Sequence, residues 1–114
     1  MKRDFIYKVV CCLYFNKLNK LEIFVLSEIL NLYHGDFIYL STESRSKVEE
    51  IIGTSYHTFS NTLRSLETFG VIKRKGKRNH TTKYELVDKE LEGVMDDGIM
   101  ILRKDLETKE DEQE

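Results

Sequence analysis

The stretch KVEEIIGTSYHTFSNTLRSLETFGVIKRKGKRNHTTKYEL, residues 47–86, decides the fold. Two glycines divide it, because a glycine adopts the left-handed conformation that commonly ends a helix. Gly53 ends a short helix, and Gly70 ends a longer one that begins at Tyr56. Ser55 is placed as the N-cap of the longer helix, since its hydroxyl can accept a hydrogen bond from a free backbone N–H. The pattern predicts a helix, a tight turn and a second helix.

The residues after the second glycine have the pattern of two short strands. Residues 71–75 and 83–87 combine apolar, β-branched and aromatic side chains. Residues 76–82 join them and contain turn-forming side chains, so the sequence predicts a β-hairpin with a long tip. Tyr84 and Leu86 are expected to pack this hairpin onto the core.

The short helix before the turn has its own start signal. Ser46 and Glu49 have the spacing of a capping box, in which each side chain accepts from the other residue's backbone N–H. This spacing predicts a helix that begins at residue 47. Its buried stripe is expected to be formed by Val48, Ile51 and Ile52.

The N-terminal part of the chain has similar signals. Asn19 and Glu22 form another capping box, and apolar residues then recur at helical spacing as far as Gly35, which is expected to end this helix. Residues 37–40 have the composition of a short strand. Residues 5–15 are apolar on all sides and include β-branched and aromatic residues, so a helix and a strand are both possible. A helix or an extended packing arm is favoured.

Several functional classes lack support in the sequence. The adjacent thiols of Cys11 and Cys12 cannot join without heavy strain, so we expect buried, reduced cysteines. The three histidines have no partners at zinc-binding spacing, and no phosphate loop or nucleophile elbow is present. We therefore expect no enzyme, no catalytic residue, no metal and no cofactor. No apolar run is long enough to cross a membrane and no signal-peptide pattern is present, so a cytoplasmic protein is expected.

Charge is distributed unevenly along the chain. The net charge of −2 divides into +1 for residues 1–40, +4 for residues 41–87 and −7 for residues 88–114. No acidic residue occurs from 70 to 84. Such a basic segment is typical of contact with a polyanion. Its basic residues are Lys73, Arg74, Lys75, Lys77, Arg78 and Lys83.

The helix at residues 55–69 has an unusual polar face. Its apolar side carries Phe59, Leu63 and Leu66, with Tyr56 close by. Its opposite side lacks the Glu and Lys residues that usually cover a solvated helix. Asn and Arg can each make two hydrogen bonds to a base edge, to adenine and guanine respectively. The polar side carries His57, Asn61, Arg64 and Thr68, flanked by Ser60 and Ser65.

From Leu21 to Val87 the chain resembles a winged helix-turn-helix domain. The resemblance rests on the helix that ends at Gly53, the capping Ser55 and the segment LETFGVI, which matches the helix-end and strand-start signature of that fold. The sequence is similar to small winged-helix proteins of phages and plasmids, including replication initiators, and more distantly to MarR-type regulators. It departs from them at Glu49, where the family usually has a small residue.

The resemblance implies a mainly α fold with a small β-hairpin wing, in the α+β class, and double-stranded DNA as the partner. The recognition helix at 55–69 would lie in the major groove, and the wing at 73–83 would lie on the backbone. His57 and His80 are expected to be neutral hydrogen-bonding groups rather than pH-sensitive contacts. The implied DNA-binding residues are Ser55, Tyr56, His57, Ser60, Asn61, Arg64, Lys73, Arg74, Lys75, Lys77, Arg78, Asn79, His80 and Lys83.

The sequence is expected to divide into two parts. Residues 1–88 would form the winged-helix domain, and residues 89–114 would form an acidic extension whose last residues are disordered. Within the extension, residues 91–106 could form a helix or a strand. The expected function is a transcriptional regulator or a replication-initiation factor, dimeric through residues 5–15 or 91–106. The alternative is a module that binds other proteins in a replication, transcription or virion assembly.

Overall fold

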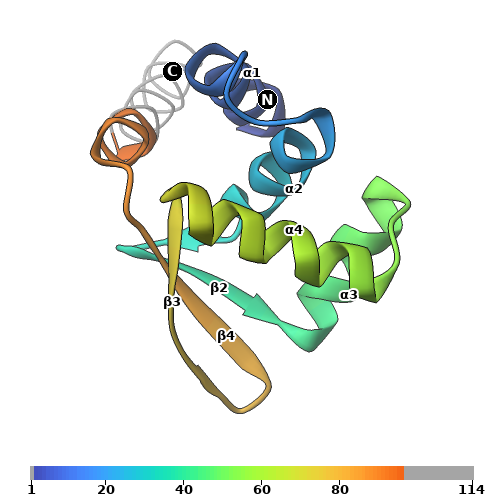
Figure 1. The fold of residues 1–114 in the computed structure, drawn as a ribbon. Helices are drawn as coiled ribbons and strands as arrows, with labels where there is room; N and C mark the ends of the chain where they lie inside the picture. The colour runs from blue at the N-terminus through green and yellow to red at the C-terminus, as the bar shows by residue number, and fades with distance from the viewer. Residues whose placement is uncertain (1, 97–114) are drawn as a thin grey trace, which may run out of the picture.

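The computed structural model of the chain describes residues 2–96, and residue 1 and residues 97–114 lie outside it. The fold is helix-rich with one small antiparallel sheet, and therefore belongs to the α+β class (Figure 1). A further helical segment occupies residues 89–96. The elements are α1 (Lys2–Tyr14), α2 (Lys20–Leu30), β1 (Tyr33–His34), β2 (Phe37–Ser41), α3 (Thr42–Ile52), α4 (Tyr56–Phe69), β3 (Ile72–Arg78) and β4 (Thr81–Leu86).

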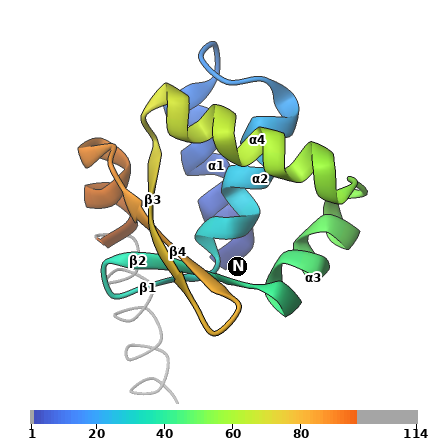
Figure 2. The ribbon, with the colours of Figure 1, turned by 60° about the horizontal axis from the view of Figure 1, so that its bottom comes forward.

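The four strands are arranged in the order β1-β2-β4-β3, and each neighbouring pair is antiparallel. The β3–β4 hairpin is thereby joined along its length to β2, with Ile38 opposite Tyr84 and Ser41 opposite Thr81. Helices α1, α2 and α4 gather on one side of this sheet (Figure 2). Successive side chains of a strand point to opposite sides, so the sheet has one side that faces the helices and one that faces away.

The hydrophobic core lies between the helices and the sheet. Helix α2 is central and contributes four side chains with no measurable exposure. Helix α1 packs against it through Ile6, Val10 and Tyr14, which resolves the segment at residues 5–15 in favour of a helix. The core residues of α2 are Val25, Leu26, Ile29 and Leu30, and those of α4 are Phe59, Leu63 and Leu66.

Helix α3 begins five residues earlier than the sequence predicted. Its N-cap is Ser41, whose hydroxyl accepts the backbone N–H of Ser44 at 3.0 Å, so Ser46 lies inside the helix. The hydroxyl of Ser41 takes this role because strand β2 runs directly into the helix. The expected buried stripe is also wrong at one position, since Ile51 is 54% exposed.

Gly35 does not end a helix, contrary to the prediction. Helix α2 ends at Leu30, and the next residue, Asn31, donates its backbone N–H to the last turn. The chain then forms the short strand β1, which pairs with the start of β2. Gly35, with φ of +66°, lies in the turn between these strands, where its lack of a side chain permits the left-handed conformation.

The tip of the β3–β4 hairpin is short rather than long. Asn79 and His80 alone connect the strands, and both have positive φ, of 50° and 63°. Two consecutive left-handed residues form the tight turn whose twist matches paired strands. The pairing register shifts between Arg74 and Gly76, which places a bulge at Lys75.

The two cysteines are less buried than predicted. Cys11 is half-buried, Cys12 is exposed, and both thiols are free. Helix α1 turns Val10 toward α2, which leaves the two cysteines on its flank and its outer side.

The chain beyond β4 continues to pack against the same core. One carboxylate oxygen of Asp88 accepts backbone N–H groups at the start of the helical segment 89–96, and the other accepts the Tyr14 hydroxyl at 2.6 Å. Leu91 and Met95 are fully buried within the core cluster. Residues 89–96 are therefore helical, whereas the rest of the 91–106 stripe and the predicted disordered end lie outside the described residues. The predicted domain boundary at residue 88 stays a prediction.

The buried side chain of Tyr33 makes stability depend on alkaline pH. Burial first, and then Asp96, raises the pKa of Tyr33 from 10.0 to about 12. Because the folded pKa exceeds the unfolded one, this contribution is fully present below pH 10 and is lost as pH rises towards about 12. Replacing Tyr33 with phenylalanine is expected to flatten the fall in unfolding free energy over this range, as measured by urea denaturation at stepped pH. An unchanged slope would contradict this assignment.

Candidate nucleic-acid interface

Helices α3 and α4 are joined by a three-residue turn. Gly53 adopts the left-handed conformation, with φ of +77°, and donates its backbone N–H to the Glu49 carbonyl at 2.8 Å. The hydroxyl of Ser55 then accepts the backbone N–H of Thr58 at 3.2 Å, which caps α4. The predicted end of α3 and both predicted ends of α4 are confirmed.

Helix α4 has one buried face and one polar face, as predicted. Phe59, Leu63 and Leu66 are buried, and the side chains on the opposite face are open to solvent. The first turn contains no acidic residue, so the partial positive charge of the helix N-terminus is not neutralised by its own side chains. The exposed residues are His57, Asn61, Arg64, Ser65 and Thr68.

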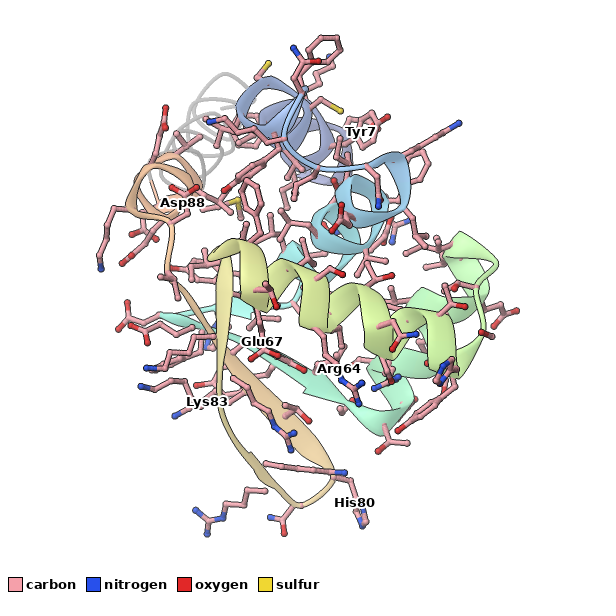
Figure 3. All side chains as sticks on the ribbon, in the orientation of Figure 1. Tyr7, Arg64, Glu67, His80, Lys83 and Asp88 are labelled. Carbon is pink, nitrogen blue, oxygen red and sulfur yellow. The ribbon has the colours of Figure 1, made fainter. Side chains whose placement is uncertain are left out.

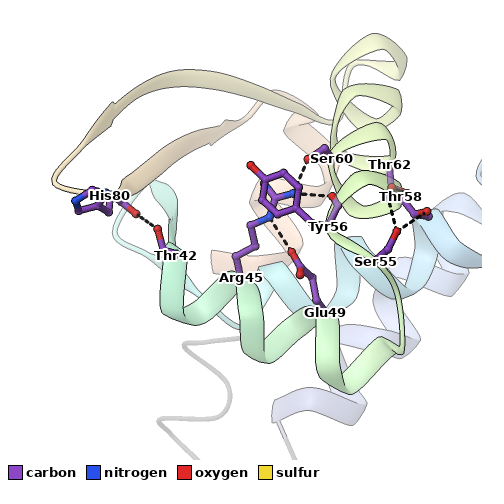
Figure 4. A network of polar contacts seen from close by, with 9 residues as sticks. All are labelled: Thr42, Arg45, Glu49, Ser55, Tyr56, Thr58, Ser60, Thr62 and His80. Atoms are coloured by element: carbon purple, nitrogen blue, oxygen red, sulfur yellow. Dashed lines mark hydrogen bonds and ion pairs between the residues drawn. The ribbon is translucent and has the colours of Figure 1, made fainter.

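Arg45 on α3 holds the first turns of α4 in place (Figure 4). Its guanidinium donates to the Glu49 carboxylate at 2.9 Å, to the Tyr56 carbonyl at 2.9 Å and to the Ser60 hydroxyl. The guanidinium carbon also lies 3.8 Å from the centre of the Tyr56 ring and 5.0 Å from that of Phe59. This one side chain therefore joins the two helices by hydrogen bonds and by cation–π contact.

This contact involves two residues of α4 that were predicted to contact DNA. Ser60 is half-buried and its hydroxyl accepts from Arg45, so only its O–H donor and one lone pair are left for other partners. Tyr56 is 67% exposed, but one face of its ring covers the guanidinium. Among the predicted base-contacting residues, Asn61 and Arg64 remain exposed.

Arg45 itself was not among the predicted site residues. Its signal in the sequence is the four-residue spacing to Glu49, which places the two side chains on one face of a helix. The spacing could not be interpreted from the sequence alone, because the helix was expected to begin at residue 47 and Arg45 then lay outside it. The same contact explains how a glutamate fits at position 49, where the winged-helix pattern usually has a small residue. The Glu49 carboxylate is paired with Arg45, and the side chains of Arg45 and Glu49 are 18% and 17% exposed.

The basic residues of the hairpin lie on both sides of the sheet. Arg74 is paired with Tyr84, which is buried on the helix side, and the register places Lys77 on this side too. Lys83 lies on the other side, with its Nζ atom 4.1 Å from the centre of the Phe37 ring. In Figure 3, Arg64 and Lys83 are seen on opposite sides of the hairpin. Lys73, Lys75 and Arg78 share the side of Lys83.

Arg74 lies close to the charged groups of α3 and α4. The Glu67 carboxylate on α4 accepts the backbone N–H of Arg74 at 2.9 Å. Burial, and then Glu67, raises the pKa of Tyr84, whereas Arg74 and Arg45 act to lower it. The Glu67 hydrogen bond thus joins α4 to β3 beside Arg74.

The hairpin tip is held against the start of α3. The backbone N–H and the hydroxyl of Thr42 both donate to the His80 carbonyl, at 3.0 and 3.2 Å (Figure 4). The side chains of Asn79 and His80 remain exposed. These two hydrogen bonds fix the backbone of the hairpin tip to α3.

Two further features, a metal-binding cluster and a membrane-spanning helix, have no counterpart in residues 2–96. No group of three or more His, Cys, Asp or Glu side chains in this part of the chain could hold a metal ion. None of its helices is long and apolar enough to cross a membrane.

Comparison with known proteins assigns no family. A scan against protein-family models finds no match, and a search of curated proteins finds no significant relative.

Proposed function

We propose that this protein binds double-stranded DNA with a sequence preference, as a winged helix-turn-helix protein acting in transcriptional regulation or replication initiation. The observation that carries the proposal is the polar face of α4, which lies beside the basic helix side of the hairpin. Residues 56–86 contain seven basic and two acidic residues. One of the two acids, Glu67, already accepts a backbone N–H of β3.

Helix α4 suits the major groove of B-DNA. That groove admits an α-helix, and its base edges present donors and acceptors that amide and guanidinium groups can match. Asn61 and Arg64 are one turn apart on the exposed face, so both can reach neighbouring base pairs. His57 and Ser55, at the start of the helix, would contact a phosphate, which the helix N-terminus also favours.

The hairpin would contribute phosphate contacts beside the groove. Arg74 and Lys77 are exposed on the helix side of the hairpin, and neither takes part in an ion pair within the described residues. Contacts to phosphate fix the orientation of a protein on DNA and supply most of its non-specific affinity. In this arrangement α4 would supply sequence preference and the hairpin would supply affinity.

Replacing Arg64 with alanine tests the role of α4. Once a preferred duplex has been selected from random sequence, this variant is expected to lose about tenfold or more in affinity for it, because one two-bond base contact is removed. Affinity for random duplex is expected to fall much less. The measurement is fluorescence anisotropy with both duplexes.

The matched control for Arg64 is Ser65→Ala on the same helix. The Ser65 hydroxyl donates to the Asn61 carbonyl of its own helix at 3.1 Å, so its loss is expected to leave affinity unchanged within about twofold. Equal losses on the preferred and the random duplex in the Arg64 variant would count against base contact by α4.

The alternative, a protein-binding module, has one supporting feature. Phe15 is 75% exposed after α1, and Tyr7 on α1 is 40% exposed and stacks on Phe24. Tyr7 and Phe15 are also exposed residues of the predicted dimer segment 5–15. Ultracentrifugation of the pure protein at micromolar concentration tests the dimer. Recovery of a stoichiometric protein partner from nuclease-treated lysate, without DNA binding, would favour the module.

A further inference from the structure

The side of the sheet that faces away from the helices carries a groove of about 510 Å³. Its lining includes Tyr39 from β2, Lys83 from β4 and Gly76 from β3, which lie side by side across the three strands. Lys75 and Arg78 contribute to the rim. This groove contains none of the α4 residues to which the proposed duplex contact is assigned.

Two features of β3 produce the groove. Gly76 lies opposite Lys83 and has no side chain to fill the space, and a Cβ atom at this position would meet no atom within 4 Å. The bulge at Lys75 bends the strand here. The backbone of Gly76, with φ of +147°, has a conformation that other residues rarely adopt, so both the opening and the bend depend on glycine.

The groove combines an exposed aromatic ring with positive charge. Tyr39 is 41% exposed and packs edge-on against Phe37, at 6.3 Å between ring centres. Lys75, Arg78 and Lys83 bring positive charge to its lining, which contains no acidic residue. Lys77 also borders the groove, although the register places it on the helix side. The nearest carboxylate, Glu85, is 3.5 Å from the Lys75 amine and so neutralises only part of this charge.

We propose that this groove binds single-stranded nucleic acid. One base would stack on the ring of Tyr39, and the phosphates on either side would contact Lys83, Lys75 and Arg78. Aromatic rings on which bases stack, set among basic residues that follow the backbone, are the shared chemistry of surfaces that bind single strands without strict sequence preference. Such a site lies on the opposite side of the sheet from α4, so the protein could hold a duplex and a single strand together.

The test is anisotropy of a labelled twelve-nucleotide oligothymidine with the full chain at low salt. Tyr39→Ala is expected to raise the Kd about tenfold, the loss of one stacked base, whereas Tyr39→Phe is expected to leave it within about twofold. Tyr7→Ala is the matched control, since Tyr7 is 40% exposed on α1 and is expected to have no effect. Thermal melting by circular dichroism verifies folding. If Tyr39→Ala does not fold, the Lys75→Gln and Lys83→Gln double variant replaces it, and the loss of two phosphate contacts is expected to weaken oligothymidine binding.

The result separates this proposal from duplex binding by α4. Tyr39→Ala is expected to leave duplex affinity unchanged, and Arg64→Ala is expected to leave oligothymidine affinity unchanged. Three outcomes would overturn the proposal. The first is failure of the wild-type protein to bind oligothymidine, and the second is an equal loss of oligothymidine affinity in Tyr39→Ala and Tyr39→Phe. The third is displacement of labelled oligothymidine by thymidine monophosphate at the same concentration of nucleotides. The last outcome would assign the groove to a small nucleotide.

Discussion

Replacing Arg45 with alanine is expected to lower the free energy of unfolding by about 2–3 kcal/mol, and the melting temperature by about 10 °C. The substitution leaves the Glu49 carboxylate without its partner at a site where its side chain is only 17% exposed. It also removes the donors that reach the Tyr56 carbonyl and the Ser60 hydroxyl on α4. Truncating one member of a largely buried charged pair costs more than the pair contributes, because the other charge stays desolvated.

Helix α3 provides a matched control for this prediction. Lys47 and Glu43 form a second pair with the same four-residue spacing, but their side chains are 70% and 82% exposed. Lys47→Ala is therefore expected to change the free energy of unfolding by less than about 0.5 kcal/mol. Urea denaturation measures both variants. If the two variants unfold at the same urea concentration, Arg45 does not join α3 to α4 as described.

Replacing Arg74 and Lys77 with glutamine is expected to weaken binding to random duplex by about a hundredfold at low salt. Both side chains lie on the helix side of the hairpin, beside the proposed duplex. Each lost phosphate contact removes about 0.9 from the slope of log affinity against log salt, so the slope is expected to become shallower by nearly 2. Anisotropy titrations across a salt series measure both quantities.

The opposite side of the same hairpin supplies the control variant. Lys73→Gln with Lys75→Gln removes the same charge from the side that faces away from the helices. This pair is expected to change the duplex salt slope by less than half as much, since long-range attraction is screened at moderate salt. Equal effects of the two pairs would mean that the hairpin acts through its total charge and that α4 does not orient it on the duplex.

The parts of the fold that depend on local signals could be predicted from the sequence. Ser55, Gly53 and Gly70 define the turn and both ends of α4, because a cap or a left-handed residue acts on the backbone within one turn. The capping box of Asn19 and Glu22 is confirmed for the same reason. The buried face of α4 followed from its 3.6-residue periodicity.

The parts that depend on tertiary pairing could not be predicted in this way. The strand β1 has only two residues and exists because β2 offers it a partner. The division of the basic residues between two sides depends on the strand register and on the bulge at Lys75, and neither has a clear local signal. The Arg45 contact depends on the true start of α3, which Ser41 sets from the end of a strand.

The central claim is that α4 and the helix side of the hairpin bind duplex DNA together. Its most direct test is anisotropy of the wild-type protein with a random duplex, titrated from about 50 to 200 mM salt. The account predicts binding at the low end, with a slope of log affinity against log salt of about −2 to −3, as expected for two or three charged contacts from Arg74, Lys77 and Arg64. Absence of binding at the low end, or binding that does not change with salt, would contradict it.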